Sequence, residues 1–230
     1  MADTSTRPLV NKKEVFSGLL DHPGDARYKE ICSQFAFVRK IQGDGNCFYR
    51  ALCFGHLESE LENGRALQRF KDTLLLSERE LLSAGFDESS FKDLLNVFLD
   101  VLGQCEAGGQ EGTLLRLFNE KTTSNSLVQY LRLLTSAYLQ NHADFFSHFV
   151  EAPNLKVYCT QEVETMAMEC DHVDILALSE ALGVGIHIVS MERSDKQQLV
   201  HHTIPEGATP SLHLLYKASH YDILYPHTSH

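Results

Sequence analysis

Apolar residues recur at helical spacing through the first two thirds of the chain. Leu67, Phe70 and Leu74 lie three and four positions apart, and a longer stripe with the same period begins at Phe91. Such spacing places the side chains on one face of an α-helix, where they can pack into a core. The glycine-rich run 103–112 interrupts the pattern and is predicted to be a loop. The predicted helices in this part include residues 10–20, 27–35, 47–61 and 126–140.

The pattern changes after Pro153, where short runs rich in β-branched and aromatic residues are separated by turn residues. One further helix is expected, starting at Asp171 or Asp174 and running through Leu182, and the later runs are typical of strands. An earlier strand is predicted at residues 37–41. Helices first and strands last predict an α+β fold, with an N-terminal helical part packed on a small, mostly antiparallel C-terminal sheet. The predicted C-terminal strands are residues 183–189, 199–204, 211–216 and 220–225.

A polar loop with two glycines, Gly43-Asp44-Gly45-Asn46, leads directly into the helix that is expected to begin at Cys47. The glycines allow positive φ angles in a tight turn, and the side chain of Asp44 or Asn46 can cap the helix. Cys47 then lies in the first helical turn, where free backbone N–H groups and the helix dipole favour a thiolate over a thiol. The same N–H groups are suited to stabilise an oxyanion formed when the thiolate attacks a carbonyl. Asp44, Gly45, Asn46 and Cys47 are therefore a candidate nucleophile and oxyanion loop.

A cysteine on a helix is more often a small buried hydrophobe than a nucleophile. Cys47 differs from the other five cysteines because it alone follows a glycine-bracketed polar turn, and a suitable partner lies near the C-terminus. His220 and Asp222 are two positions apart in a predicted strand, so their side chains point to the same face. Asp222 can then accept a hydrogen bond from one imidazole nitrogen while the other faces Cys47, which is the arrangement of nucleophile, base and orienting residue.

These residues resemble the ovarian tumour (OTU) class of cysteine deubiquitinases, and within it the otubain subgroup. The resemblance is carried by Gly-Asp-Gly-Asn-Cys-Phe-Tyr-Arg-Ala at 43–51 and His-Tyr-Asp-Ile-Leu-Tyr at 220–225, and it covers nearly the whole chain. It implies a papain-like OTU cysteine protease fold, with a single catalytic domain at residues 9–230 after a flexible N-terminus at residues 1–8. Further similar stretches are residues 130–136, 143–146, 169–172 and 214–217.

The resemblance also implies a role for each site residue. Cys47 would attack the carbonyl of the C-terminal glycine of ubiquitin, and His220 would protonate the leaving lysine amine and then activate water. Asp222 would orient the imidazole. For Asp44 two interpretations stay open: its side chain caps the loop, or, as the resemblance implies, its backbone N–H contributes to the oxyanion hole. The implied substrates are isopeptide bonds in polyubiquitin and in ubiquitin–protein conjugates.

A second hypothesis is a catalytically weak or inactive ubiquitin-binding module that regulates ubiquitin conjugation. The presence of Cys47, His220 and Asp222 argues against it. Otubains carry Asn in one branch and Asp in another at the position of Asp222. Repression of ubiquitin-conjugating enzymes is attributed in one branch to a long N-terminal arm, and because only a short segment precedes Gly43, we expect weak or no repression.

The negative net charge of the chain argues against a nucleic-acid partner and favours a basic one. The chain has 20 Lys and Arg against 31 Asp and Glu, a formal net charge of −11, whereas nucleic-acid-binding surfaces concentrate positive charge. An acidic groove that leads to Cys47 would suit the basic C-terminal tail of ubiquitin. The expected partners are ubiquitin and polyubiquitin chains, with ubiquitin-conjugating enzymes as a further candidate and with neither nucleic acid nor membrane. A monomer is expected.

The six cysteines show neither a Cys-x-x-Cys pair nor zinc-ligand spacing, and they are predicted to be reduced thiols. His201-His202 and Cys170-Asp171-His172 also lack the spacing of a known metal site, so neither a metal nor another cofactor is predicted. The sequence has no apolar run typical of a signal peptide or a membrane span. A cytoplasmic location is expected, with the nucleus as a second compartment.

Overall fold

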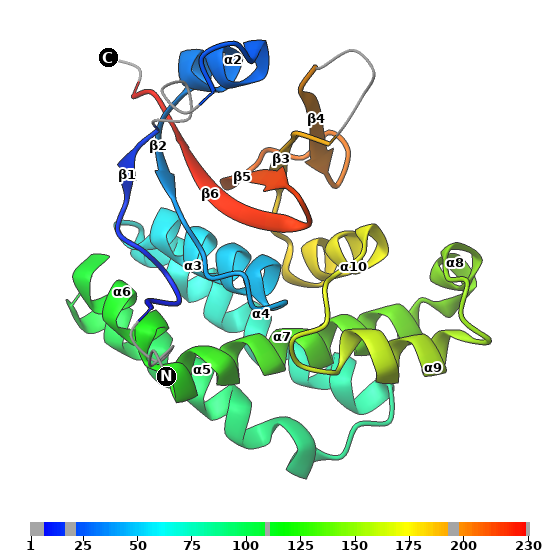
Figure 1. Ribbon diagram of the computed structural model, residues 1–230. Helices are drawn as coiled ribbons and strands as arrows, with labels where there is room; N and C mark the ends of the chain where they lie inside the picture. Colours follow the sequence, from blue (N-terminus) through cyan, green and yellow to red (C-terminus); the bar gives the residue numbers. More distant parts are fainter. Residues whose placement is uncertain (1–6, 17–21, 109–110, 193–197, 229–230) are drawn as a thin grey trace, which may run out of the picture.

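A curved sheet lies over a layer of helices in the computed structural model, which describes residues 7–16, 22–108, 111–192 and 198–228 (Figure 1). Helix α3 (Cys47–Glu60) lies between the two layers, where it contacts strand β6 (His220–Pro226) on one side and helix α7 (Lys121–Asn141) on the other. Eleven of the residues of α3 are buried. The α+β class predicted from the sequence is confirmed, and α3 carries Cys47 in its first turn.

Helix α7 is the central element of the helical layer and contacts α3, α4, α5, α6 and α10. It is enclosed on several sides, because Leu127, Leu131 and Leu134 are fully buried and so are the polar residues Ser124 and Arg132. The remaining helices are α2 (Ala26–Gln34), α4 (Gly64–Ser83), α5 (Glu88–Gly108), α6 (Glu111–Asn119), α8 (Ala143–Phe146), α9 (Leu155–Tyr158) and α10 (His172–Leu182), with a 3-10 helix at Ser147–Phe149 and a π-helix at Cys159–Val163.

The sheet joins the two ends of the chain. Its strand order is β1-β2-β6-β5-β3-β4, and every pair is antiparallel except β3 with β5. The C-terminal strand β6 therefore lies inside the sheet, with Ile223 opposite Arg39 of β2 and Asp222 opposite Leu215 of β5. The strands are β1 (Glu14–Val15), β2 (Phe35–Arg39), β3 (Ile186–Ser190), β4 (Val200–Ile204), β5 (Leu212–Lys217) and β6 (His220–Pro226).

Two predictions from the periodicity are wrong. Instead of a helix at residues 10–20, Val10 forms a bridge with Ile41 and β1 pairs with β2; residues 17–21 lie outside the described residues. Pairing with the neighbouring strand outweighs the local helical spacing. The predicted loop at 103–112 is helical as far as the end of α5, because Leu102 and Cys105 pack into the core while Gly103 faces outward. A glycine at such a position costs a helix only about 1 kcal/mol; residues 109–110 lie outside the described residues.

Other element predictions are confirmed to within a few residues. Both candidates for the start of α10 take part in it, since Asp171 is the N-cap and Asp174 completes a capping box by accepting a hydrogen bond from the N–H of Asp171 at 2.9 Å. The predicted flexible N-terminus falls largely outside the described residues, which begin at residue 7. In the described part of the chain, no helix combines the length and the apolar character needed to cross a membrane.

Candidate active site

Cys47 is the first residue of α3, and two backbone N–H groups in this turn have no hydrogen-bond partner among the described residues. The first helical hydrogen bond runs from the N–H of Arg50 to the carbonyl of Asn46 at 3.1 Å, so the N–H of Cys47 precedes the helical ladder. Asn46 is the N-cap residue, but its side chain makes no capping bond to the helix. Among the described residues, neither the N–H of Cys47 nor that of Gly45 has a hydrogen-bond partner. These two amides are available to an oxyanion beside the sulfur.

The structure favours the capping interpretation of Asp44. Its Oδ1 accepts a hydrogen bond from the N–H of Asn46 at 2.9 Å, which closes the turn. Its own N–H donates to the carbonyl of Gln42 at 3.1 Å and is therefore occupied. In this geometry the N–H groups of Gly45 and Cys47 are the ones left available as donors, whereas Asp44 shapes the turn that presents them.

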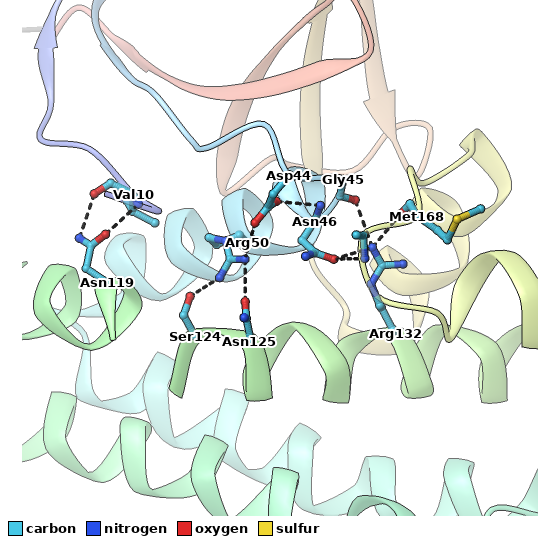
Figure 2. A network of polar contacts seen from close by, with 11 residues as sticks. Val10, Asp44, Gly45, Asn46, Arg50, Asn119, Ser124, Asn125, Arg132 and Met168 are labelled. Carbon is cyan, nitrogen blue, oxygen red and sulfur yellow. Dashed lines mark hydrogen bonds and ion pairs between the residues drawn. The ribbon is translucent and has the colours of Figure 1, made fainter. Parts of the chain in front are cut away.

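Two buried arginines hold the glycine loop from below (Figure 2). Arg50 of α3 donates from Nη2 to Asp44 Oδ2 at 3.1 Å and to Asn125 Oδ1 at 2.9 Å, and its Nη1 donates to Ser124 Oγ. Burial lowers the pKa of Arg50, and the carboxylate of Asp44 opposes this shift. Arg50 thus neutralises the carboxylate nearest to the nucleophile and ties it to α7.

Arg132 reaches the same loop from a point about two turns further along α7. It donates to the carbonyl of Gly45 at 3.1 Å and to Asn46 Oδ1 at 2.8 Å. Neither Arg50 nor Arg132 was assigned a role from the sequence, although both lie in stretches that carry the otubain resemblance. Most of their partners are oxygen atoms of residues distant in the chain, and such contacts leave no periodic signal in the sequence.

His220 and Asp222 lie side by side on β6, as their spacing predicts. His220 Nε2 is 2.9 Å from Asp222 Oδ1, and the same carboxylate oxygen accepts the N–H of Ile41 at 2.8 Å. Asp222 is therefore held from the neighbouring strand as well as by the imidazole. Gly43 lies against the other edge of the ring, because a Cβ placed on this glycine would be 3.5 Å from Nδ1 of His220.

The pKa of His220 is raised to about 10, first by its hydrogen bond with Asp222 and second by its interaction with the Cys47 side chain; partial burial acts in the opposite direction. His220 consequently stays protonated through neutral pH, next to the sulfur of Cys47. The structure thus brings together Cys47, His220 and Asp222, and it places Asp44, Gly45 and Asn46 in the turn beside them. This arrangement of a cysteine, an imidazolium and unpaired amides is suited to acyl transfer from a carbonyl group.

Three neighbouring hollows, each sharing lining residues with the next, lead away from Cys47 and are together called the groove. A narrow cavity of about 30 Å³ beside the sulfur is lined by Cys170 and Tyr221, and Cys170 also lines the next hollow along the surface. Asp171 and His172 line both that hollow and a third cavity of about 370 Å³, which we call the aromatic pocket. The walls carry the acidic side chains Glu169, Asp171 and Glu192. The aromatic pocket is lined by Phe145, Phe146, Phe149, Val173, Leu176, Ile204, Pro205 and Glu206 as well.

No group of three His, Cys, Asp or Glu side chains in the described part of the chain is arranged to hold a metal ion. His201 instead bonds to a histidine of the neighbouring strand, with His201 Nδ1 3.0 Å from His187 Nε2. The six cysteines are free thiols.

Comparisons with known proteins identify the family of the chain. Residues 4–226 match the family Peptidase C65, otubain. The chain is 45% identical over 235 residues to "Ubiquitin thioesterase OTUB2" of Homo sapiens, with all of both chains covered. It is 42% identical over 225 residues to "Ubiquitin thioesterase OTUB1" of Homo sapiens, covering 95% of this chain and 83% of the relative. A solved structure of h/ceOTUB1 with ubiquitin aldehyde and UBC13~Ub superimposes with a TM-score of 0.89 at 28% identity, over 98% of this chain and 93% of that chain.

Proposed function

Because this chain belongs to the peptidase C65 otubain family, we propose that it is a cysteine deubiquitinase that hydrolyses isopeptide bonds at the C-terminal glycine of ubiquitin. The observation that carries the proposal is the position of Cys47: it begins α3 beside unpaired amides and lies next to the protonated His220. The family match supports the activity, and the geometry of the site supports the catalytic roles of Cys47 and His220.

The reaction follows from these positions. The thiolate of Cys47 attacks the carbonyl carbon, a C–S bond forms, and the N–H groups of Gly45 and Cys47 stabilise the oxyanion. When the C–N bond breaks, the proton of the His220 imidazolium passes to the lysine amine. The imidazole then accepts a proton from water, whose oxygen attacks the thioester, and the C–S bond breaks to release ubiquitin and restore the thiolate. Asp222 holds the ring through both steps.

The groove supports ubiquitin as the partner. Its narrow end beside Cys47 suits a glycine, which has no side chain, and the acidic residues Glu169 and Asp171 suit a basic tail. The exposed rings of Phe145 and Phe149 at the far end offer an apolar surface to the body of the ubiquitin molecule. Related solved structures contain both ubiquitin aldehyde and UBC13~Ub, so ubiquitin-conjugating enzymes are further candidate partners.

The test is a panel of di-ubiquitins with different linkages, incubated with the wild type and with Cys47→Ala. We expect the wild type to convert at least one linkage to mono-ubiquitin and Cys47→Ala to convert none. The competing hypothesis of an inactive ubiquitin-binding module predicts ubiquitin binding without cleavage of any linkage by the wild type. Binding measured by titration alongside the cleavage assay separates the two.

Asp222→Asn should retain activity within about tenfold, or about 1.4 kcal/mol of barrier, while Asp222→Ala should lose more. A single oxygen of Asp222 accepts both the N–H of Ile41 and the hydrogen bond of His220, and an amide oxygen can do the same. Papain-like proteases use Asn in this role. The measurement is kcat/KM on one di-ubiquitin for the three proteins. An equal loss for Asn and Ala would instead mean that the negative charge is required.

We also propose a cytoplasmic location, with the nucleus as a second compartment, because all six cysteines are free and Cys47 must stay reduced to act. Imaging of a fluorescently labelled full chain checks this directly. Signal confined to the secretory pathway would contradict it.

A further inference from the structure

Arg132 is a fully buried guanidinium that contacts the glycine loop, the end of the π-helix, the segment after it and Tyr49 of α3. None of the carboxylates in the described ranges forms a salt bridge with it. Burying a charge without an ion pair is costly, so the hydrogen bonds of Arg132 are needed to replace those that its guanidinium would make with water. Its face lies over the ring of Tyr49, with Cζ 4.4 Å from the ring centre. Its polar partners are the carbonyls of Gly45, Val163 and Met168 and the side-chain oxygen of Asn46.

The peptide bond between Gly45 and Asn46 is held at both of its polar atoms. Its carbonyl oxygen accepts from Arg132 Nη2 at 3.1 Å, and its N–H donates to Asp44 Oδ1 at 2.9 Å. The second oxygen of that carboxylate is in turn paired with Arg50. If this peptide plane rotated, the carbonyl of Gly45 would leave Arg132 and its negative end could point toward the place of the oxyanion. The glycine at position 45, with φ 82°, would allow such a rotation.

The segment that follows the π-helix closes the other side of the loop. A Cβ on Gly45 would be 1.9 Å from the carbonyl oxygen of Ala167, so the two backbones are already in close contact. Asn46 Oδ1 accepts from Arg132 at 2.8 Å and from the N–H of Ala167 at 2.9 Å, and Arg132 also donates to the carbonyl of Met168 at 2.7 Å. Figure 2 shows Arg132 extending from α7 to the point where the loop and this segment meet.

We infer that Arg132 is a positioning residue for acyl transfer: it holds the Gly45–Asn46 peptide so that the amides of Gly45 and Cys47, and not a carbonyl, face the oxyanion. The inference rests on the proposed deubiquitinase function. It predicts that Arg132 affects the step in which charge develops on the carbonyl oxygen, and neither the binding of ubiquitin nor the nucleophilicity of Cys47.

The experiment compares the wild type with Arg132→Lys and, as a matched control, Arg39→Lys. Arg39 is also fully buried, but it bonds to Glu58 and Tyr225 away from the loop. Three quantities are measured: kcat and KM for a ubiquitin C-terminal amide substrate, the rate at which iodoacetamide alkylates Cys47 as followed by mass spectrometry, and the thermal unfolding midpoint. Alkylation requires the thiolate but no oxyanion hole.

For Arg132→Lys we expect kcat to fall at least tenfold, with KM and the alkylation rate each changed by less than about threefold; losing one oxyanion donor outright costs about 10²–10³ in kcat. Arg39→Lys should keep kcat within about threefold at a temperature below both unfolding midpoints. Asn46→Ala, which removes one partner of Arg132, should show the same selective loss of kcat and serves if Arg132→Lys does not fold.

Two results would overturn the inference. One is an unchanged kcat in the folded variants, and the other is a fall in alkylation parallel to the fall in kcat, which would assign the effect to the thiolate. If the wild type itself leaves the ubiquitin substrate intact, the proposed function fails instead, so the two failures are distinguishable.

Discussion

A ubiquitin that carries an electrophile at its C-terminus should label Cys47 and none of the other five cysteines. Cys47 lies beside His220 at the end of the groove, whereas Cys53, Cys105 and Cys159 are buried in the core. Burial raises the pKa of each of these three thiols, that of Cys159 to about 12. Their thiolates are therefore scarce as well as inaccessible.

Cys170 and Cys32 are the informative controls for this labelling. Cys170 lines the same narrow cavity as Cys47, but burial raises its pKa well above the usual range. Cys32 is partly exposed on α2, and no residue of α2 lines the three hollows of the groove. Mass spectrometry of the adduct should locate all label at Cys47, and Cys47→Ala should remain unlabelled. An adduct at any other cysteine in that variant would remove the central claim.

His220→Ala should lower kcat/KM by about 10²–10⁴-fold, the usual contribution of a general acid–base group. The wild type should also lose activity on the alkaline side as the pH approaches 10, because the pKa of His220 is raised to about 10 and the imidazolium supplies the proton to the leaving amine. Asp222 is the largest cause of that raised pKa, so Asp222→Ala should move the alkaline limb toward the ordinary histidine range near 6.5.

The pH dependence of kcat/KM for wild type and Asp222→Ala on one substrate checks both parts. The limits of each profile belong to the Cys47–His220 pair as a whole, not to one residue. If the alkaline limb does not move in Asp222→Ala, then the carboxylate is not what keeps the imidazolium protonated. Cleavage by His220→Ala at a rate near that of the wild type would show that another group acts as the acid and base.

The parts of the site that could be predicted from the sequence are those with a local signal. Cys47 follows a glycine turn at a helix start, and the two-residue spacing of His220 and Asp222 on a strand places both side chains on one face. Pairing of β6 with its neighbours then fixes where that face lies. Cys47 comes close to that face only because α3 packs against β6, and no local pattern in the sequence specifies this packing.

Arg132 illustrates what could not be predicted. The apolar stripe of α7 contains Leu127, Leu131 and Leu134, and a charged residue beside such a stripe normally faces solvent. Here the glycine loop, the end of the π-helix and the segment after it cover that side of α7, so the guanidinium is buried and bonds to carbonyl groups. The helix predicted at residues 10–20 is wrong for the same reason, namely a contact distant in the chain. Strand β1 is defined by its pairing with β2, which the local pattern does not show.

The position of β6 inside the sheet has a consequence for when the site is assembled during folding. Strand β6 supplies His220 and Asp222, follows the other described strands in the chain, and must insert between β2 and β5. The pairing of β2 with β6 spans almost the whole chain, and contacts of such long range form late in folding. Until β6 has paired with β2 and β5, His220 and Asp222 are not in place beside Cys47. Under the proposed function, a partly folded chain therefore has a nucleophile without its acid–base partner, and the chain becomes active only when the sheet is complete.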